Sequence, residues 1–135
     1  MPIVHPEEVN LAGDLGATVV VWKNITEADI CEPFGVGAWE HIGIQLVGTY
    51  GSDGNTGLVI EGSMFGYREK DSAIYQTLRE AGRADLTRYP SPLAAREPTE
   101  HPWNVFERVN LIRPRIVDGT NWDVTVYMAM FQGRR

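Results

Sequence analysis

Cysteine is nearly absent from this sequence, and the single Cys31 cannot form a disulfide within the chain. Long apolar runs are missing too, since none approaches the about 20 residues that a membrane-spanning helix needs. Residues 1–8 have neither the basic start nor the apolar core of a signal peptide. These absences predict a chain without a disulfide framework or a membrane anchor, kept in a reducing cytoplasm. We interpret Cys31 as a small buried residue with an inert thiol.

Positive charge is also in short supply. Lys and Arg number 12 against 18 Asp and Glu, so the formal net charge is −6. This balance argues against a nucleic-acid-binding surface as the main function. It suits docking onto a basic surface but does not select such a partner. At 135 residues, the chain is long enough for one domain that buries a core without covalent staples.

Alternating apolar residues predict the first three strands, at residues 17–23, 39–50 and 58–62. In residues 42–63, two alternating runs flank a turn rich in Gly, Asp and Asn, which is the pattern of a β-hairpin. Residues 1–16 contain two prolines and several turn formers, so we expect them to form an extended N-terminal arm.

Two segments in the middle of the chain are less regular. In residues 71–82, Ile74, Leu78 and Ala81 have helical spacing, but the same stretch also alternates as a strand would. Periodicity leaves helix and strand open for a segment this short. Residues 88–103 contain four prolines and predict a long Pro-rich loop without regular structure. Loops of this length tend to be functional or disordered.

Three late strands are expected at residues 104–108, 111–117 and 123–132. Pro114 removes a backbone donor, which predicts that its strand lies at a sheet edge or is locally bulged. Many short strands, little helix and no strand–helix–strand rhythm predict an all-β fold. We expect an antiparallel two-sheet sandwich, jelly-roll-like, formed by one domain over residues 17–135.

Patterns of catalytic or metal-binding residues are scarce. The three histidines, His5, His41 and His101, lie far apart and lack metal-ligand spacing. With no nucleophile elbow and no phosphate-binding motif, the sequence yields no catalytic, metal-binding or cofactor-binding candidate. Trp103 and Trp122 lie beside loops, where each is either a lid on the core or a contact residue, and we favour the lid.

Five short motifs follow one another in a fixed order. They are Val20-Val21-Trp22, Gly48-Thr49-Tyr50-Gly51, Val59-Ile60-Glu61-Gly62-Ser63, Ile112-Arg113-Pro114 and Val124-Thr125-Val126. In the order and spacing of these motifs, the chain from about residue 17 to residue 130 resembles the capsid cement or decoration proteins of tailed bacteriophages. The resemblance implies a β-sandwich fold and a non-enzymatic structural protein on the capsid surface of the virion.

The resemblance also bears on the irregular segments. In that family the Glu-Gly-Ser stretch runs into an Asn-Asp-Gly turn and a Trp-x-x-Leu strand, whereas here Ser63 is followed by Met64-Phe65-Gly66. After an insertion, Tyr75 and Leu78 stand where that Trp and Leu would be. The resemblance therefore favours a strand near residues 74–79. It also makes the Pro-rich loop longer than the family needs.

Partners and location follow from the same resemblance. It implies a protein that is made in the host cytoplasm, binds the major capsid protein and bridges neighbouring capsid subunits. We expect homo-oligomers, dimers or trimers, because an edge strand at residues 111–117 invites pairing between copies. Neither nucleic acid nor a membrane is an expected partner, and no cofactor is. The expected partner-binding residues are Ile3, Val4, His5, Pro92, Leu93, Trp103, Arg113 and Arg115.

Two alternative functions stay open at this point. The motif order is also similar to that of discoidin-like carbohydrate-binding jelly rolls, in which exposed aromatics and loop carboxylates could hold a glycan on the virion surface. A structural component of the phage tail or neck is the other alternative. It differs from a capsid decoration protein mainly in copy number per virion.

Overall fold

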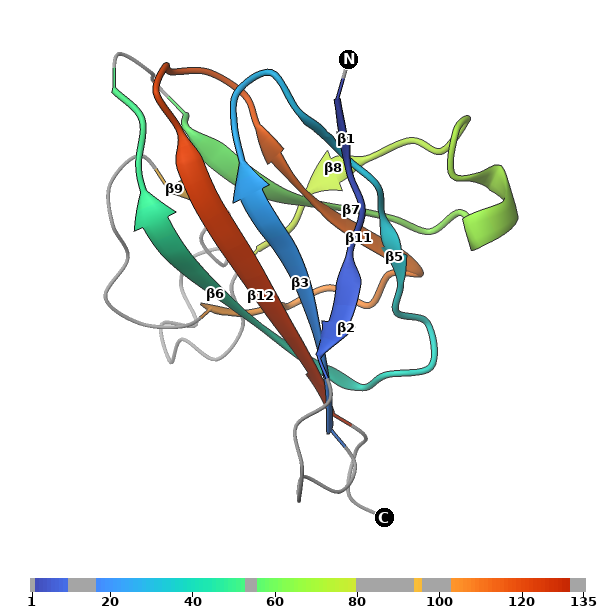
Figure 1. Ribbon diagram of the computed structural model, residues 1–135. Helices are drawn as coiled ribbons and strands as arrows, with labels where there is room; N and C mark the ends of the chain where they lie inside the picture. The colour runs from blue at the N-terminus through green and yellow to red at the C-terminus, as the bar shows by residue number, and fades with distance from the viewer. Residues whose placement is uncertain (1, 10–16, 53–55, 80–93, 96–102, 132–135) are drawn as a thin grey trace, which may run out of the picture.

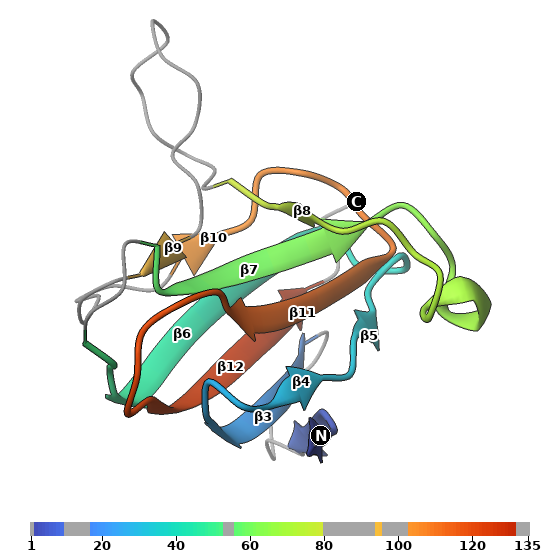
Figure 2. The ribbon, with the colours of Figure 1, turned by 90° about the horizontal axis from the view of Figure 1, so that it is seen from above.

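The structure, a computed structural model, describes residues 2–9, 17–52, 56–79, 94–95 and 103–131. Within these residues two five-stranded sheets pack against each other (Figures 1 and 2), which confirms the expected all-β, antiparallel sandwich. The strands are β1 (Ile3–Val4), β2 (Glu7–Val9), β3 (Ala17–Ile25), β4 (Ile30–Cys31), β5 (Phe34–Gly35), β6 (His41–Thr49), β7 (Leu58–Ser63), β8 (Gln76–Thr77), β9 (Ala94–Ala95), β10 (Trp103–Asn104), β11 (Leu111–Ile116) and β12 (Asp123–Phe131), with one 3-10 turn, η1 (Tyr67–Glu69).

One layer, here called the front sheet, has the strand order β10-β6-β12-β3-β2 with antiparallel neighbours. Two of its long strands, β6 and β12, alternate in burial over most of their length. In β12, the side chains of Val124, Val126, Met128 and Met130 are buried, and those between them are partly or fully exposed. Because successive side chains of a strand point to opposite faces, this alternation puts one face of the sheet on the core and the other outside.

The other layer, here called the back sheet, has the order β5-β11-β7-β8, and β9 also pairs with β7. Every residue of β7 is buried. Leu58 and Ile60 belong to the core between the sheets, whereas Val59 and Glu61 alternate onto the outer face. A strand covered on both faces reads as a nearly continuous apolar run, and Glu61 is the charged exception.

The hairpin predicted for residues 42–63 is wrong. β6 pairs with β10 and β12 in the front sheet, whereas β7 pairs with β8, β9 and β11 in the back sheet. The alternation identified both strands, but it carries no information on which strand each one pairs with. Ile44 on β6 and Ile60 on β7 both face the core. The two strands therefore bury their apolar faces against each other across the layers.

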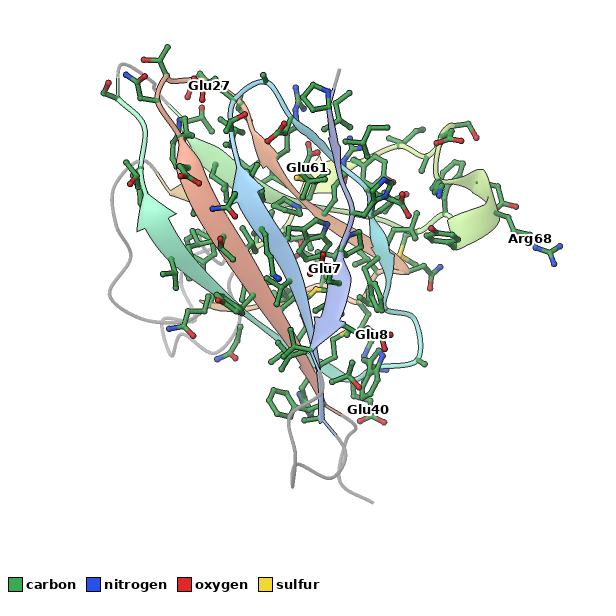
Figure 3. All side chains as sticks on the ribbon, in the orientation of Figure 1. Glu7, Glu8, Glu27, Glu40, Glu61 and Arg68 are labelled. Atoms are coloured by element: carbon green, nitrogen blue, oxygen red, sulfur yellow. The ribbon has the colours of Figure 1, made fainter. Side chains whose placement is uncertain are left out.

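Two carboxylates tie together the connections at one end of the sandwich. Asp118 accepts a hydrogen bond from the backbone N–H of Gly57 at 2.6 Å. Glu27 accepts hydrogen bonds from the backbone N–H groups of Asn121 and Trp122 at 2.9 and 3.1 Å (Figure 3). Bonds from the backbone of Glu27 itself, then of Asn121 and Trp122, lower the pKa of Glu27. These bonds satisfy backbone donors where the chain crosses between sheets.

The position of Pro114 in β11 confirms the expected edge. Only Leu111 and Ile112 pair with β5, so among the described strands the remainder of β11, from Arg113 to Ile116, pairs with β7 alone. Pro114 lies in this edge part, where a residue without an N–H costs the sheet least. The start of β11 is interior, because β5 covers it.

The described residues of the N-terminal arm, 2–9, lie along the sandwich as extended strands. β1 pairs in parallel with β4, with Ile3 opposite Ile30 and Val4 opposite Cys31. β2 pairs with β3 and forms one edge of the front sheet. Residues 10–16 lie outside the described residues.

The two irregular segments contain strands where they are described. In residues 71–82, Gln76–Thr77 form β8, as the family resemblance favoured, and the last three residues lie outside the described part. In residues 88–103, Ala94–Ala95 pair with β7 and Trp103 begins β10. The expectation of a loop without regular structure is wrong at these positions, because Ala94–Ala95 add to the edge of β7 and Trp103 adds to the edge of β6. The rest of this segment lies outside the described residues.

Large aromatic side chains fill the core. Trp22 has no exposed surface, and its indole N–H donates a hydrogen bond to the backbone carbonyl of Glu32 at 2.8 Å. Trp103 and Trp122 are 6% and 3% exposed, in agreement with the lid interpretation. Cys31 is also buried, and this burial raises the pKa of its thiol to about 12, which confirms an inert cysteine.

Candidate functional site

Residues 64–75, here called the projection, leave the sandwich between β7 and β8. The projection carries η1 and extends to one side of both sheets (Figures 1 and 2). Arg68 in η1 points away from the sandwich (Figure 3). Binding residues occur disproportionately on loops that a rigid scaffold holds in place. The projection is therefore the first candidate for a partner-binding site.

The projection gathers exposed apolar side chains. Met64 and Ile74 expose 68% and 66% of their surface, Tyr67 exposes 48% and Phe65 exposes 39%. Single exposed apolar residues are ordinary on any protein surface. Met64, Phe65 and Ile74 lie around one hollow and so make a patch of the kind that marks protein–protein contact sites, whereas the Tyr67 hydroxyl binds Glu32.

Two hollows flank the projection. The larger, about 500 Å³, lies between the projection and the β1–β4 pair, and its lining includes the apolar Ile3 and Ile30 beside the charged Lys70. The smaller, about 330 Å³, lies between the projection and β8, with Phe65 and Ile74 in its lining. Both hollows mix apolar and charged groups, so they suit the side chains of a protein partner.

The carboxylate of Glu32 connects the projection to the N-terminal segment. Its Oε1 accepts a hydrogen bond from the Tyr67 hydroxyl at 2.6 Å, and its Oε2 lies 2.6 Å from Nδ1 of His5. Lys70 Nζ lies 3.6 Å from the same carboxylate and donates a hydrogen bond to the Tyr67 hydroxyl at 3.0 Å. These four residues, the Glu32 junction, fix η1 against the end of β1.

Hydrogen bonds within the Glu32 junction favour the charged forms of Glu32 and Lys70. The Tyr67 hydroxyl, helped by His5 and Lys70, holds the pKa of Glu32 below its usual value of 4.5 in spite of some burial. The bond to the Tyr67 hydroxyl also raises the pKa of Lys70. Both shifts favour the ion pair between Glu32 and Lys70 at neutral pH.

Acid is expected to loosen the Glu32 junction. Because the folded-state pKa of Glu32 is lowered, its stabilising contribution is complete above about pH 4.5 and is lost as the pH falls through the folded-state value. Glu32→Gln should therefore be less stable than the wild type at pH 7, and this difference should shrink toward pH 3. Urea denaturation of both proteins at several pH values measures it. Glu40→Gln, at an exposed carboxylate, should show no such convergence, and a Glu32→Gln difference independent of pH would contradict the assignment.

A second ionic group joins the projection to the back sheet. Glu61, 5% exposed, accepts a hydrogen bond from Nε of Arg113 at 3.2 Å and one from Nη1 of Arg115 at 3.3 Å. The Arg113 guanidinium also lies 3.6 Å from the ring centroid of Tyr75, at the end of the projection. Cation–π stacking of this kind adds to the ion pair and holds the ring in place. Arg113 thus links β7, β11 and the projection.

Three of the predicted partner-binding residues lie near the projection. Ile3 and Arg113 line the larger hollow, and His5 belongs to the Glu32 junction beside it. Val4, next to them in sequence, is partly buried and packs on the core.

The other predicted residues do not join this site. The predicted role of Trp103 is corrected. Its side chain is buried where β10 pairs with β6 and therefore does not offer a surface contact. Arg115 is half-exposed and bound to Glu61. Pro92 and Leu93 lie outside the described residues.

Sequence reasoning missed the apolar residues of the projection. A signal for them was present, since the apolar Met64-Phe65 follow directly on the end of β7 at Ser63. They also stand where the resembled family has a polar Asn-Asp-Gly turn.

The described part of the chain has neither a cluster of metal ligands nor a helix that could span a membrane. No three His, Cys, Asp or Glu side chains there lie close enough to hold a metal ion. His5 lies at the Glu32 junction and His41 lies in β6 of the front sheet, whereas His101 lies outside the described residues. No helix in these residues has the length and apolar character to cross a membrane.

Comparisons with known proteins bear on the fold. No family model matches the sequence, and no curated protein matches it. Among solved structures, the crystal structure of the SPBc2 prophage-derived protein YomS is similar, with a TM-score of 0.54 and 14% sequence identity. The match covers 90% of this chain and 98% of YomS. At this identity the similarity concerns the fold, and it extends over nearly the whole of both chains.

Proposed function

We propose that this chain is a non-enzymatic structural protein of a bacteriophage virion. In this proposal it binds the outer surface of the capsid and stabilises the shell by bridging neighbouring subunits of the major capsid protein. Two observations support a phage origin: the motif order resembles that of phage decoration proteins, and the same sandwich occurs in a prophage-derived protein. Both observations concern the fold and the family resemblance. Support for binding to the capsid must therefore come from a surface of the protein that could contact a partner.

The observation that carries the proposal is the apolar patch on the projection. Met64, Phe65 and Ile74 are exposed on a segment that two ionic groups, at Glu32 and at Glu61, hold against the sandwich. A patch presented in a fixed geometry binds with a smaller loss of conformational entropy than a loose loop. The ionic groups at Glu32 and Glu61 serve to position the projection.

Bridging between capsid subunits explains how such a small contact surface could bind tightly enough. A protein that touches two adjacent capsid subunits gains from effective concentration, so weak contacts made together hold it on the shell. The net charge of −6 adds long-range attraction if the docking surface on the capsid is basic.

Co-sedimentation tests the proposal. The purified protein is mixed with capsids that come from the phage encoding it but that were assembled without this protein. Wild-type protein should sediment with the capsids at a fixed ratio. The double variant Phe65→Glu/Ile74→Glu should bind at least about tenfold more weakly, because two charges would be buried in an apolar contact. Val117→Glu is the matched control, since it also charges an exposed apolar residue but lies beyond the far end of β11.

Wild-type protein that stays in the supernatant would overturn the proposal, as would equal binding of the double variant and the wild type. The number of copies per virion separates the capsid from the alternatives in the tail or neck. A decoration protein should number in the hundreds, and a neck component about a dozen.

A further inference from the structure

We propose that the smaller hollow, between the projection and β8, is a socket for an apolar side chain of the capsid, and that Arg108 binds a carboxylate beside that side chain. The socket rests on the proposed function, because its occupant belongs to the capsid surface. It adds the chemistry of that occupant, which is an aromatic or large aliphatic side chain with an acidic neighbour.

The socket continues the core-facing side of the back sheet beyond the core itself. In β8 and the residues beside it, Ile74, Gln76 and Leu78 are alternate residues and share one side, opposite to Tyr75. Tyr75 lies on the outer face, where its ring stacks on the guanidinium that binds Glu61. Leu78 belongs to the core and is 2% exposed, whereas Ile74 at the other end of the same row is 66% exposed. Nothing in the described part of the chain covers this end of the row.

Apolar groups form the floor and the rim of the socket. Leu78 and Val109 pack over Gly62, where a Cβ atom would lie 2.8 Å from Cδ2 of Leu78 and 3.0 Å from Cγ2 of Val109. Phe65 and Ile74 lie on the rim. The volume of about 330 Å³ is at the lower end of the range for ligand sites, which is about 300–1,000 Å³. A hollow of this size suits one or two side chains of a partner.

Hydrogen bonds hold the walls of the socket on both sides. On the side of the projection, Nδ2 of Asn110 donates a hydrogen bond to the backbone carbonyl of Met64 at 2.6 Å. On the other side, Glu107 accepts hydrogen bonds from the backbone N–H and from Nε of Arg79, at 2.8 and 3.0 Å. Walls that are fixed before binding reduce the conformational entropy that the complex loses.

The charges around the socket select an acidic group beside the apolar one. Glu107 is neutralised by Arg79, whereas Arg108 lines the hollow as an exposed cation. Of the Lys and Arg residues that the structure describes, all but Arg68 and Arg108 have a carboxylate within ion-pair distance. Arg68 points away from the sandwich (Figure 3), so Arg108 supplies the unpaired charge at the socket. Interfaces place opposite charges against each other, which favours a carboxylate of the partner at this point.

The contact of Arg108 acts at short range. Charges further apart than the Debye length, about 8 Å at physiological ionic strength, are largely screened from each other. A single carboxylate next to the occupying side chain is therefore compatible with a capsid surface that is basic overall, to which the net charge of −6 is attracted.

A variant that fills the socket tests it by capsid co-sedimentation. Gln76 is exposed and lines the hollow, so Gln76→Trp places an aromatic ring of the chain itself in the space for the occupant. Binding should weaken at least about tenfold, because the apolar anchor of an interface carries a large share of its affinity. The melting temperature should not fall, since the ring fills an apolar hollow. Thr49→Trp is the matched control: it adds the same ring at an exposed position of β6 and should bind as the wild type does.

Variants of Arg108 test the carboxylate contact. Arg108→Glu should weaken binding at least about tenfold, because it sets two like charges against each other, whereas Arg108→Lys should stay within about threefold of the wild type. Lys23→Glu is the matched control, since it changes the net charge by the same amount at an exposed position of β3. Equal weakening by Lys23→Glu and Arg108→Glu would show a long-range effect of net charge and would overturn the contact.

The outcomes separate the socket from the proposed function. Wild-type protein that binds capsids, together with a folded Gln76→Trp variant that binds equally well, refutes the socket and leaves the proposed function intact. Wild-type protein that does not bind refutes both. If Gln76→Trp fails to fold, Arg108→Glu still decides, because binding equal to the wild type contradicts the predicted occupant. A Gln76→Trp variant that changes the oligomeric state and still binds capsids would identify a second copy of this chain as the occupant, against the proposal.

Discussion

Replacing Glu61 with alanine is expected to destabilise the protein by about 3 kcal/mol. Glu61 lies on the covered outer face of β7 and binds both Arg113 and Arg115. Its removal leaves the Arg113 guanidinium, which is 24% exposed, without a carboxylate. The cost falls at the lower end of the range for buried ion pairs, since Arg113 keeps some contact with water and with the ring of Tyr75.

Urea denaturation at neutral pH measures this loss, which corresponds to a melting temperature about 10 °C lower. Arg115→Ala is the matched control, because Arg115 is 56% exposed and its removal should cost less than about 1 kcal/mol. Replacing all three charges with apolar residues of similar volume should recover most of the stability. A Glu61→Ala variant within about 0.5 kcal/mol of the wild type would show that the group is solvated and carries little energy.

Truncation of Trp22 is expected to cost about 3–5 kcal/mol, the range for removing a fully buried aromatic side chain. Trp22 has no exposed surface and packs between the sheets on β3. Its indole N–H also donates a hydrogen bond to the carbonyl of Glu32, which precedes the segment leading to β5. Trp22→Ala therefore removes core volume and unpairs a partly buried carbonyl at once.

Trp22→Phe separates these two contributions. Phenylalanine restores most of the apolar volume but is unable to donate the hydrogen bond, so about 1–3 kcal/mol of destabilisation should remain. Thermal unfolding followed by near-ultraviolet circular dichroism measures both variants. Equal stability of Trp22→Phe and the wild type would mean that the bond to Glu32 contributes nothing.

The strands themselves could be predicted from local pattern. The alternation in β12 and in β6 places Val126 and Ile44 on the core side, and the structure buries both. The backbone chemistry of proline was equally informative, because within a sheet a residue without an N–H is confined to an edge, a strand start or a bulge. Pro114 accordingly lies in the part of β11 that no second described strand covers.

Pairing between strands could not be predicted in the same way. β6 and β7 are neighbours in sequence with a turn-like connection, yet they lie in different sheets. Two strands joined in a hairpin and two strands joined across the layers have the same alternating sequence pattern. The choice depends on which arrangement buries more apolar surface in the complete molecule.

The candidate site, too, was predicted from the sequence only in part. His5 and Ile3 were selected from an N-terminal segment, and both lie beside the projection. The prediction of partner-binding residues missed Phe65 and Ile74. Neither the pair Met64-Phe65 nor the single Ile74 forms a periodic pattern that would mark it as exposed. Arg113 was predicted as a partner-binding residue, and the carboxylate that it binds within the chain lies 52 residues away in sequence.

By itself, the sequence determined the all-β fold class of this protein, together with its core residues and its proline edge. These features are local, since they depend on the pleat of a strand and on the donors of single residues. Only the tertiary structure decided that β6 and β7 part into two layers, that Glu61 is buried between two arginines, and that the projection presents an apolar patch. These are properties of packing between distant segments, and the free energy that fixes them comes from surface buried jointly by residues that no local pattern relates.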